Sequence, residues 1–175
     1  MVMVFRLEPK YLKLYPALIA TLFLASCSFA PLGIAVPDIN LPAGTTFGTI
    51  CYSEVTESAP VNFTSVKYNA KALYKSGSSL GKFQQLNIVV FARKTDPLPG
   101  SPLKCVLSQS SADKKISGII QLKSGIAQDI SIGGSTLAGI VSQNKYWIGV
   151  ATTDSAFISL PGSVKLTNGN IQAFF

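Results

Sequence analysis

The residues of this chain best suited to chemistry are its three cysteines, Cys27, Cys51 and Cys105. Cys27 differs from the other two because it ends an apolar run and directly follows two small residues, Ala25 and Ser26. Small side chains let an extended backbone enter a peptidase cleft. A cysteine thiolate is a nucleophile that can accept a lipid group. The setting of Cys27 therefore predicts a site of processing and covalent modification.

The segment before Cys27 has the two parts of an export signal. Arg6, Lys10 and Lys13 form a basic leader, and an apolar core follows at residues 14–24. A helix that crosses a bilayer needs about 20 mostly apolar residues, so this core is too short to be a permanent anchor. It has the length expected of a cleaved signal peptide, which we predict for residues 1–26.

The four residues Leu24-Ala25-Ser26-Cys27 resemble the lipobox of bacterial lipoproteins. The resemblance covers the leader alone. It implies cleavage between Ser26 and Cys27, a diacylglyceryl group on the Cys27 thiol, and acyl chains such as palmitate that hold the mature protein at the cell envelope. Each buried methylene contributes about 0.8 kcal/mol, so two or three chains anchor a protein stably where one does not. The competing interpretation is an ordinary signal peptide with a chance cysteine nearby.

The resemblance also implies an address in the envelope. By analogy with lipoproteins of enteric bacteria, Ser28 after the lipidated cysteine favours the outer membrane. In an organism with a single membrane the anchor would lie in the outer face of the cytoplasmic membrane. Export also places Cys51 and Cys105 in an oxidising compartment, where a pair of cysteines favours a disulfide. The alternative for this pair is two buried thiols that never meet.

The mature chain is long enough for one domain preceded by a tether. Residues 27–46 contain the lipidated cysteine and three spaced prolines, Pro31, Pro37 and Pro42, which favour an extended spacer. Apolar residues within the same stretch leave open that part of it packs as an edge strand. We assign residues 47–175 to a single folded domain.

Residues 47–175 carry the pattern of an all-β domain. Apolar residues alternate at residues 66–74, and a turn at residues 76–79 predicts a hairpin with a second strand at residues 82–92. The run Ile88-Val89-Val90-Phe91 predicts that this second strand is buried on both faces. Further strands are expected at residues 115–122, 126–132, 136–142, 145–152, 156–160, 163–167 and 170–175. The last two are separated by Asn168-Gly169, a type I′ hairpin signal.

About ten short strands in about 130 residues predict an antiparallel β-sandwich, immunoglobulin-like or similar.

Catalytic chemistry finds little support in the composition. The chain has no histidine, which excludes Ser-His and Cys-His nucleophile pairs and removes the commonest zinc ligand. Glu54 and Glu57 are three apart on a strand and point to opposite faces. We predict neither enzyme activity nor a metal or other cofactor.

Two features predict binding. Lys67, Lys71 and Lys75 lie at strand spacing and would form a basic row on one face of a sheet. An anionic surface could bind this row, although a polar strand face is also what solvent alone requires. Tyr146 and Trp147 are adjacent, so one faces the core and the other does not. Burial in the core is the favoured interpretation for Trp147; if exposed, it could instead stack on a sugar ring.

After removal of the leader's three basic residues and Glu8, twelve basic and seven acidic residues remain, a net charge of +5. Eleven of the twelve cations are lysines, so the bidentate readout that arginine gives to nucleic acids is nearly absent. The expected partners are the membrane, through the lipid, and an envelope protein or an anionic glycan. The predicted function is a noncatalytic structural or binding module at the cell envelope. The alternatives are a carrier of an apolar ligand and a hydrolase that needs no histidine.

Overall fold

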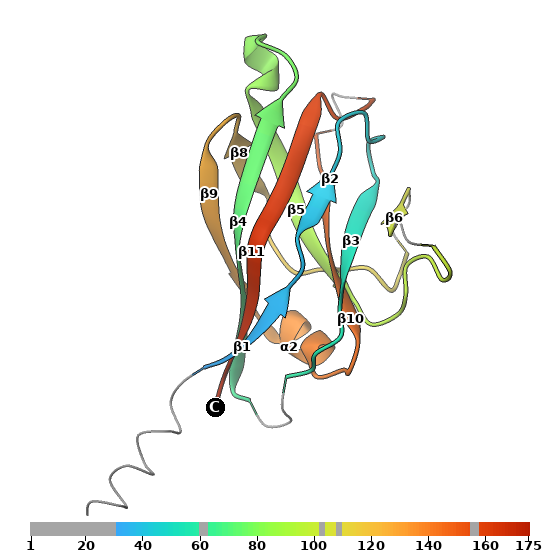
Figure 1. Cartoon of the computed structure of the whole chain (residues 1–175), viewed down its shortest axis with the longest axis vertical. Helices are drawn as coiled ribbons and strands as arrows, with labels where there is room; N and C mark the ends of the chain where they lie inside the picture. The colour runs from blue at the N-terminus through green and yellow to red at the C-terminus, as the bar shows by residue number, and fades with distance from the viewer. Residues whose placement is uncertain (1–30, 60–62, 102–103, 108–109, 155–157) are drawn as a thin grey trace, which may run out of the picture.

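The computed structural model describes residues 31–59, 63–101, 104–107, 110–154 and 158–175. Its strands form two antiparallel sheets that pack face to face (Figure 1). The prediction of an antiparallel β-sandwich is confirmed. The predicted processing site at Ser26 and Cys27 lies outside the described residues.

The first sheet, called the β4 sheet below, contains five strands in the order β1, β11, β4 and β9, with β2 also pairing with β11. The strands are β1 (Leu32–Val36), β2 (Ile39–Leu41), β4 (Ser65–Ser76), β9 (Ala127–Gly133) and β11 (Gly162–Phe174). β11 is therefore the last described strand in sequence and an inner strand of its sheet.

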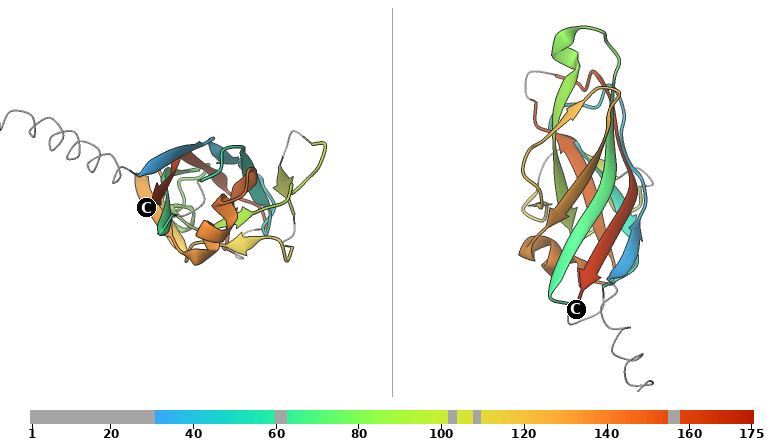
Figure 2. Two further views of the ribbon diagram at one scale, coloured as in Figure 1. Left: turned by 90° about the horizontal axis from the view of Figure 1, so that it is seen from below. Right: turned by 90° about the vertical axis from the view of Figure 1, so that its left-hand side faces the viewer.

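The second sheet, the β10 sheet, has the order β6, β3, β10, β5 and β7, with β8 pairing beside β7 on the same edge of β5. The strands are β3 (Ile50–Val55), β5 (Gln85–Arg93), β6 (Cys105–Val106), β7 (Lys114–Lys115), β8 (Ile120–Lys123) and β10 (Tyr146–Thr152). A 3₁₀ turn, η2 (Gly81–Phe83), lies at one end of the sandwich, and a short helix, α2 (Ser135–Val141), at the other (Figures 1 and 2).

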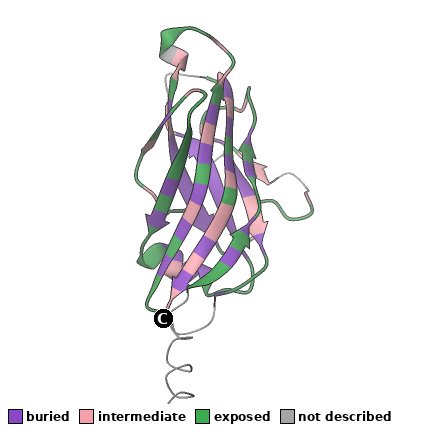
Figure 3. Ribbon diagram, turned by 60° about the vertical axis from the view of Figure 1, so that its left-hand side comes forward, coloured by how far each residue is buried: buried purple, intermediate pink, exposed green. Residues whose placement is uncertain are grey.

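The main core lies between the two sheets. Side chains alternate along β4, where Val66, Tyr68, Ala70, Ala72 and Tyr74 point inward and are buried. The same alternation appears as bands along the strands in Figure 3. Burial of these apolar faces is the main term that stabilises a sandwich.

A second apolar cluster covers the outer face of the β10 sheet. It consists of Ile50, Tyr52, Val89, Phe91, Trp147 and Ala151, with Val106 packed against it. Because Val89 and Phe91 belong to this cluster while Ile88 and Val90 belong to the main core, β5 is buried on both faces. This confirms the prediction drawn from the four-residue apolar run.

Three sequence-based expectations are wrong. Residues 32–41 are not a free tether, because β1 and β2 pair with β11, as in the edge-strand alternative. The segments before and after residues 76–79 do not form a hairpin: β4 pairs with β9 and β11, whereas β5 lies in the opposite sheet. Residues 136–142 form most of helix α2 and not a strand, since Leu137, Ile140 and Val141 bury one helical face.

The Asn168-Gly169 hairpin is also wrong. β11 runs continuously through both residues and accommodates them as a shift of register between Thr167 and Asn170. Asn168 has a φ of 54°, a value that asparagine tolerates better than most residues. The positive φ that signals a hairpin turn is therefore used here to form a β-bulge.

Two ends that are distant in sequence meet at one end of the sandwich. Leu32 pairs with Ala173, Phe174 pairs with Ser65, and Lys67 pairs with Gly133, two residues before α2 begins. The start of β1, the C-terminal residue Phe175 and α2 therefore lie together (Figure 1). Among the described residues, no helix is both long enough and apolar enough to cross a bilayer.

Candidate functional site

The basic row predicted from the sequence lies on the outer face of the β4 sheet. Lys67, Lys71 and Lys75 are exposed at alternate positions of β4, and the buried residues between them face the core. A strand places every second side chain on the same face, so the spacing of the lysines requires this arrangement. The three lysines share one face, as predicted.

Neighbouring strands extend this face with further polar side chains. On β11, Lys165 is exposed, and Gln172 stands opposite Lys67. The Asn69 side-chain amide donates a hydrogen bond to Gln172 Oε1 at 3.2 Å. We call the group formed by Lys67, Asn69, Lys71, Lys75, Lys165 and Gln172 the lysine-amide face.

A shallow depression of about 300 Å³ opens on the lysine-amide face between β4, β9 and the β11 bulge. Asn69, Lys71, Ser131 and Asn168 contribute polar groups to its lining. The bulge explains the presence of Asn168, since it inserts extra residues into β11 at this level of the sheet. The depression thus combines hydrogen-bonding amides and a hydroxyl with the cation of Lys71 and the carboxylate of Asp129.

The charge of the lysine-amide face is mostly uncompensated. Asp129 on β9 is the acidic residue beside it, and its carboxylate lies 3.7 Å from Lys71 Nζ, with both side chains largely exposed. Lys67 Nζ lies 5.7 Å from the centroid of the Phe174 ring. Within the described part of the chain, Lys67, Lys75 and Lys165 form no ion pair. The face can therefore attract an anionic polymer.

Trp147 is not available for stacking on a ligand, which corrects its assignment as a binding residue. Its side chain is 3% exposed and packs in the outer apolar cluster, while Tyr146 is fully buried in the main core. Lys145 Nζ lies 5.4 Å from the centroid of the Trp147 ring and forms an ion pair with Glu54 at 2.9 Å. Alternation did send the two aromatic rings to opposite faces, but both faces of β10 are covered.

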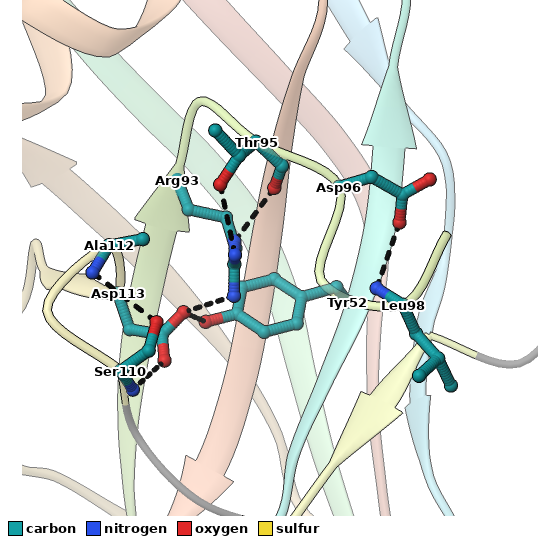
Figure 4. A network of polar contacts seen from close by, with 8 residues as sticks. All are labelled: Tyr52, Arg93, Thr95, Asp96, Leu98, Ser110, Ala112 and Asp113. Carbon is teal, nitrogen blue, oxygen red and sulfur yellow. Dashed lines mark hydrogen bonds and ion pairs between the residues drawn. The ribbon is translucent and has the colours of Figure 1, made fainter.

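A buried polar network holds the segments after β5 beside Tyr52 of the outer cluster, and the Arg93 guanidinium lies 5.9 Å from the centroid of the Tyr52 ring (Figure 4). Arg93 Nη1 donates to Asp113 Oδ1 at 2.9 Å, and the Tyr52 hydroxyl donates to the same oxygen at 2.7 Å. Arg93 also donates to the backbone oxygen and the hydroxyl of Thr95. Burial, and the hydrogen bond to Asp113, raise the pKa of Tyr52 above its ordinary value.

The network formed by Arg93, Asp113 and Tyr52 has a structural role. The Arg93 guanidinium donates its hydrogen bonds to Asp113 and Thr95, so it is not free to bind a substrate. Burying such a pair is favourable only when its hydrogen bonds are satisfied in this way. Loss of Asp113 would leave the Tyr52 hydroxyl and Arg93 Nη1 without the acceptor that they share, so Asp113 joins β3, β5 and the loop.

The predicted disulfide is present between Cys51 and Cys105, which lie opposite each other on β3 and β6. It connects residues separated by 54 positions. Nearby, Lys104 Nζ donates to Asp96 Oδ2 at 2.9 Å and to the Leu98 backbone oxygen. The hydrogen bond from Lys104 holds the pKa of the Asp96 carboxyl below its usual range. The disulfide at Cys105 and the ion pair between Lys104 and Asp96 together hold the loop that carries β6.

The remaining sequence candidates stay separate. Glu54 forms an ion pair with Lys145 at 2.9 Å. Over the part of the chain that the structure describes, no group of three cysteine, aspartate or glutamate residues could hold a metal ion. Sequence reasoning missed Lys165, Asn168 and Gln172, because their relation to the basic row depends on β11 pairing with β4.

The fold and the lysine-amide face define a β-sandwich domain with one polar, cationic sheet face. Among solved structures, the xylan-binding module CBM15 is similar at a TM-score of 0.44 and 9% identity, covering 82% of this chain and 97% of its own. The CBM22-1 xylan-binding domain from Paenibacillus barcinonensis is similar at a TM-score of 0.40 and 10% identity, covering 84% of this chain and 96% of its own. No protein-family model matches the chain. No curated protein matches it either.

Proposed function

We propose that the protein is a lipid-anchored, noncatalytic binding module of the cell envelope, and that the lysine-amide face of its β4 sheet binds an anionic glycan. The observation that carries the proposal is the row of Lys67, Lys71 and Lys75 beside hydrogen-bonding amides and a depression. Lysine ammonium groups attract carboxylate or phosphate groups of a polymer, and amides bond its hydroxyls.

The relation between anchor and domain supports a position close to the membrane. Four residues, 28–31, separate Cys27 from the start of β1 at Leu32. A chain spans at most about 3.5 Å per residue, so these residues reach on the order of 14 Å. An acyl group on Cys27 would therefore hold the end of the sandwich that carries Leu32 and Phe175 next to the bilayer.

The carrier alternative receives no support from the space between the sheets. Large side chains fill it, and Tyr68, Tyr74, Tyr146 and Ile148 are each almost fully buried there. The depression on the lysine-amide face is open to solvent and includes polar lining. A glycan strand lying across the face suits this shape better than an enclosed apolar ligand does.

The glycan proposal is tested by triple charge reversal, Lys67→Glu with Lys71→Glu and Lys75→Glu. The control reverses Lys94, Lys114 and Lys123, which are exposed elsewhere and change the net charge equally. With oligogalacturonate as probe, each lysine contributes about 1 kcal/mol, so the first triple variant should bind about 100-fold more weakly. The control should bind within about threefold of the parent protein. Equal losses in both variants, or none, would refute a specific face.

The anchor is tested separately by mass spectrometry of the protein extracted from membranes. We expect the mature chain to begin at Cys27 with diacylglyceryl and acyl groups attached. Cys27→Ala should release the protein from the membrane fraction without changing its affinity for oligogalacturonate. A mature chain that begins at an unmodified residue other than Cys27 would contradict the anchor and leave the glycan proposal standing.

A further inference from the structure

The β4 sheet has one long regular edge, formed by β9. β9 pairs with β4 through seven consecutive residues from Lys67↔Gly133 to Leu73↔Ala127, without a shift of register. In the described parts of the chain no strand pairs with its other side. Alternate residues of such a strand direct their N–H and C=O groups away from the sheet. β9 therefore offers a row of backbone donors and acceptors.

The other sheet edges are short or broken. β1 and β2 are separated by Pro37 and Asp38, and β6 and β7 have two residues each. Proline, lysine, bulges and short strands are the common devices that prevent an edge from pairing with another chain. Over Ala127–Gly133 β9 has no proline, lysine or bulge, and its one charged side chain is that of Asp129. The contrast marks β9 as the edge suited to binding.

A groove of about 410 Å³ with both apolar and polar lining runs beside β9. Five isoleucines contribute to its lining, namely Ile116, Ile119, Ile120, Ile130 and Ile132. Ile130 and Ile132 come from β9. The opposite wall is held to the β10 sheet, because the Ile116 backbone N–H donates to the Val90 oxygen at 3.0 Å and the Val90 N–H donates to Ser117 Oγ at 2.9 Å.

The groove remains partly exposed to solvent. Ile119 is 66% exposed, which is unusual for so large an apolar side chain beside a core. The groove thus lies between the edges of the two sheets, next to the free side of β9. An added strand could pair with β9 while its inward side chains cover the isoleucines.

Cations stand at both ends of this groove. Lys123 lies at the β8–β9 turn, and Lys115 directly precedes Ile116 at the other end. In the described residues neither of these two lysines forms an ion pair. The ends of the groove therefore complement acidic groups on an occupant.

We infer that β9 binds an extended segment of a second protein by strand addition. The segment pairs its backbone with β9, places alternate apolar side chains in the isoleucine groove, and carries acidic residues near Lys123 at one end and Lys115 at the other. Backbone pairing supplies affinity in this mode of recognition, and the side-chain pockets supply specificity. The inference concerns a protein partner and is independent of the glycan site and of the lipid anchor.

The test uses the full-length protein in detergent micelles and a synthetic peptide in which valine alternates with threonine between terminal aspartates. We expect saturable binding and slower hydrogen exchange at alternate amides of Ala127–Gly133. A peptide of the same composition in scrambled order, and one with terminal lysines, should bind at least about tenfold more weakly. Methylation of the peptide nitrogens that face β9 should abolish binding, whereas methylation of the intervening nitrogens should not.

The protein variants are Ile119→Asp and the matched control Ile126→Asp. Both side chains are more than half exposed, so both variants should fold. Only Ile119 lines the groove, which makes Ile126→Asp the control. Ile119→Asp should weaken peptide binding at least about tenfold, and Ile126→Asp less than about twofold. The inference is overturned if the alternating peptide with terminal aspartates does not bind or if Ile119→Asp and Ile126→Asp bind it equally well. It is also overturned if hydrogen exchange slows outside Ala127–Gly133. Dimerisation of the peptide-free protein through β9 would also overturn it, since the occupant would then be a second copy.

Discussion

At the scale of single residues, two buried tyrosines face opposite hydrogen-bonding situations. The Tyr52 hydroxyl donates to Asp113 at 2.7 Å. The Tyr146 hydroxyl is buried and has no hydrogen-bond partner among the described residues. A buried polar group without a partner costs free energy that the folded state must supply from other contacts.

The two tyrosines should therefore respond oppositely to removal of the hydroxyl. Tyr146→Phe deletes an unpaired group and should raise the free energy of unfolding by about 1 kcal/mol. Tyr52→Phe removes a hydrogen bond to a charged acceptor and should lower it by about 2 kcal/mol. Urea unfolding followed by tryptophan fluorescence measures both values. A loss of stability in Tyr146→Phe would show that the hydroxyl has a partner.

The sequence is most informative at residues whose role depends on local spacing. Lys67, Lys71 and Lys75 share a face because the period of a strand is two, which holds in any sheet. Cys51 and Cys105 followed from their even number and predicted compartment. Trp147 was uncertain because alternation states which face a residue takes but not whether another layer covers that face. The segments after β5 beside the outer cluster are held by Asp113, a single acidic residue with no sequence signal.

At the scale of elements, the turn signals predicted the local backbone conformation correctly, but the hairpin pairings inferred from them are wrong. Asn168-Gly169 adopts the positive φ that its residue types favour, but inside β11. Likewise, residues 76–79 do end one strand before another, yet β5 crosses to the opposite sheet. Pairing partners are set by long-range packing, which local patterns do not encode. Helix α2 was predicted as a strand because Leu137 and Val141 fit a period of two; Ile140, buried beside Val141, fits only the helical spacing.

The β11 bulge and helix α2 give a paired prediction through their glycines. A Cβ on Gly169 would lie 2.8 Å from both Cβ and the backbone oxygen of Val36, so Gly169→Ala must displace β1. We expect a loss of about 1–3 kcal/mol in the free energy of unfolding. A Cβ on Gly139 meets nothing within 4 Å, so Gly139→Ala should stabilise α2 by about 0.5–1 kcal/mol.

Thermal and urea unfolding of both glycine variants provide the measurement. Opposite signs are the expected result. A destabilising Gly139→Ala would contradict the helical assignment of Ser135–Val141, because alanine is the better helix former. An unchanged stability in Gly169→Ala would mean that β1 can leave β11 without cost.

At the scale of the whole molecule, buried tyrosines should make the fold sensitive to alkali. Burial is the main cause that raises the pKa of Tyr52, Tyr68 and Tyr146 above 10.0, their ordinary value. A raised pKa in the folded state favours the neutral phenol there. The stability that it contributes is complete below about pH 10 and is lost as the pH rises from this value toward the folded pKa values.

We therefore expect the free energy of unfolding to fall between about pH 10 and about pH 12, by up to about 1.4 kcal/mol per pH unit for each of the three tyrosines. Urea titrations across this range measure the slope, and tyrosinate absorbance shows whether ionisation accompanies unfolding. Tyr146→Phe should reduce the slope by one tyrosine's share. Tyrosinate signal from these residues in a fully folded sample would contradict the prediction.

The position of β11 has a consequence for how the molecule assembles during synthesis. A ribosome delivers the chain from its N-terminus, so β1 and β2 emerge long before Gly162–Phe174, the strand with which both pair. Until that strand arrives, the sheet lacks the member that joins its first strands to β4. Pairing between such distant segments is slow to form. The nascent polypeptide therefore stays incompletely folded, and able to pass through a narrow channel, until translation is nearly complete.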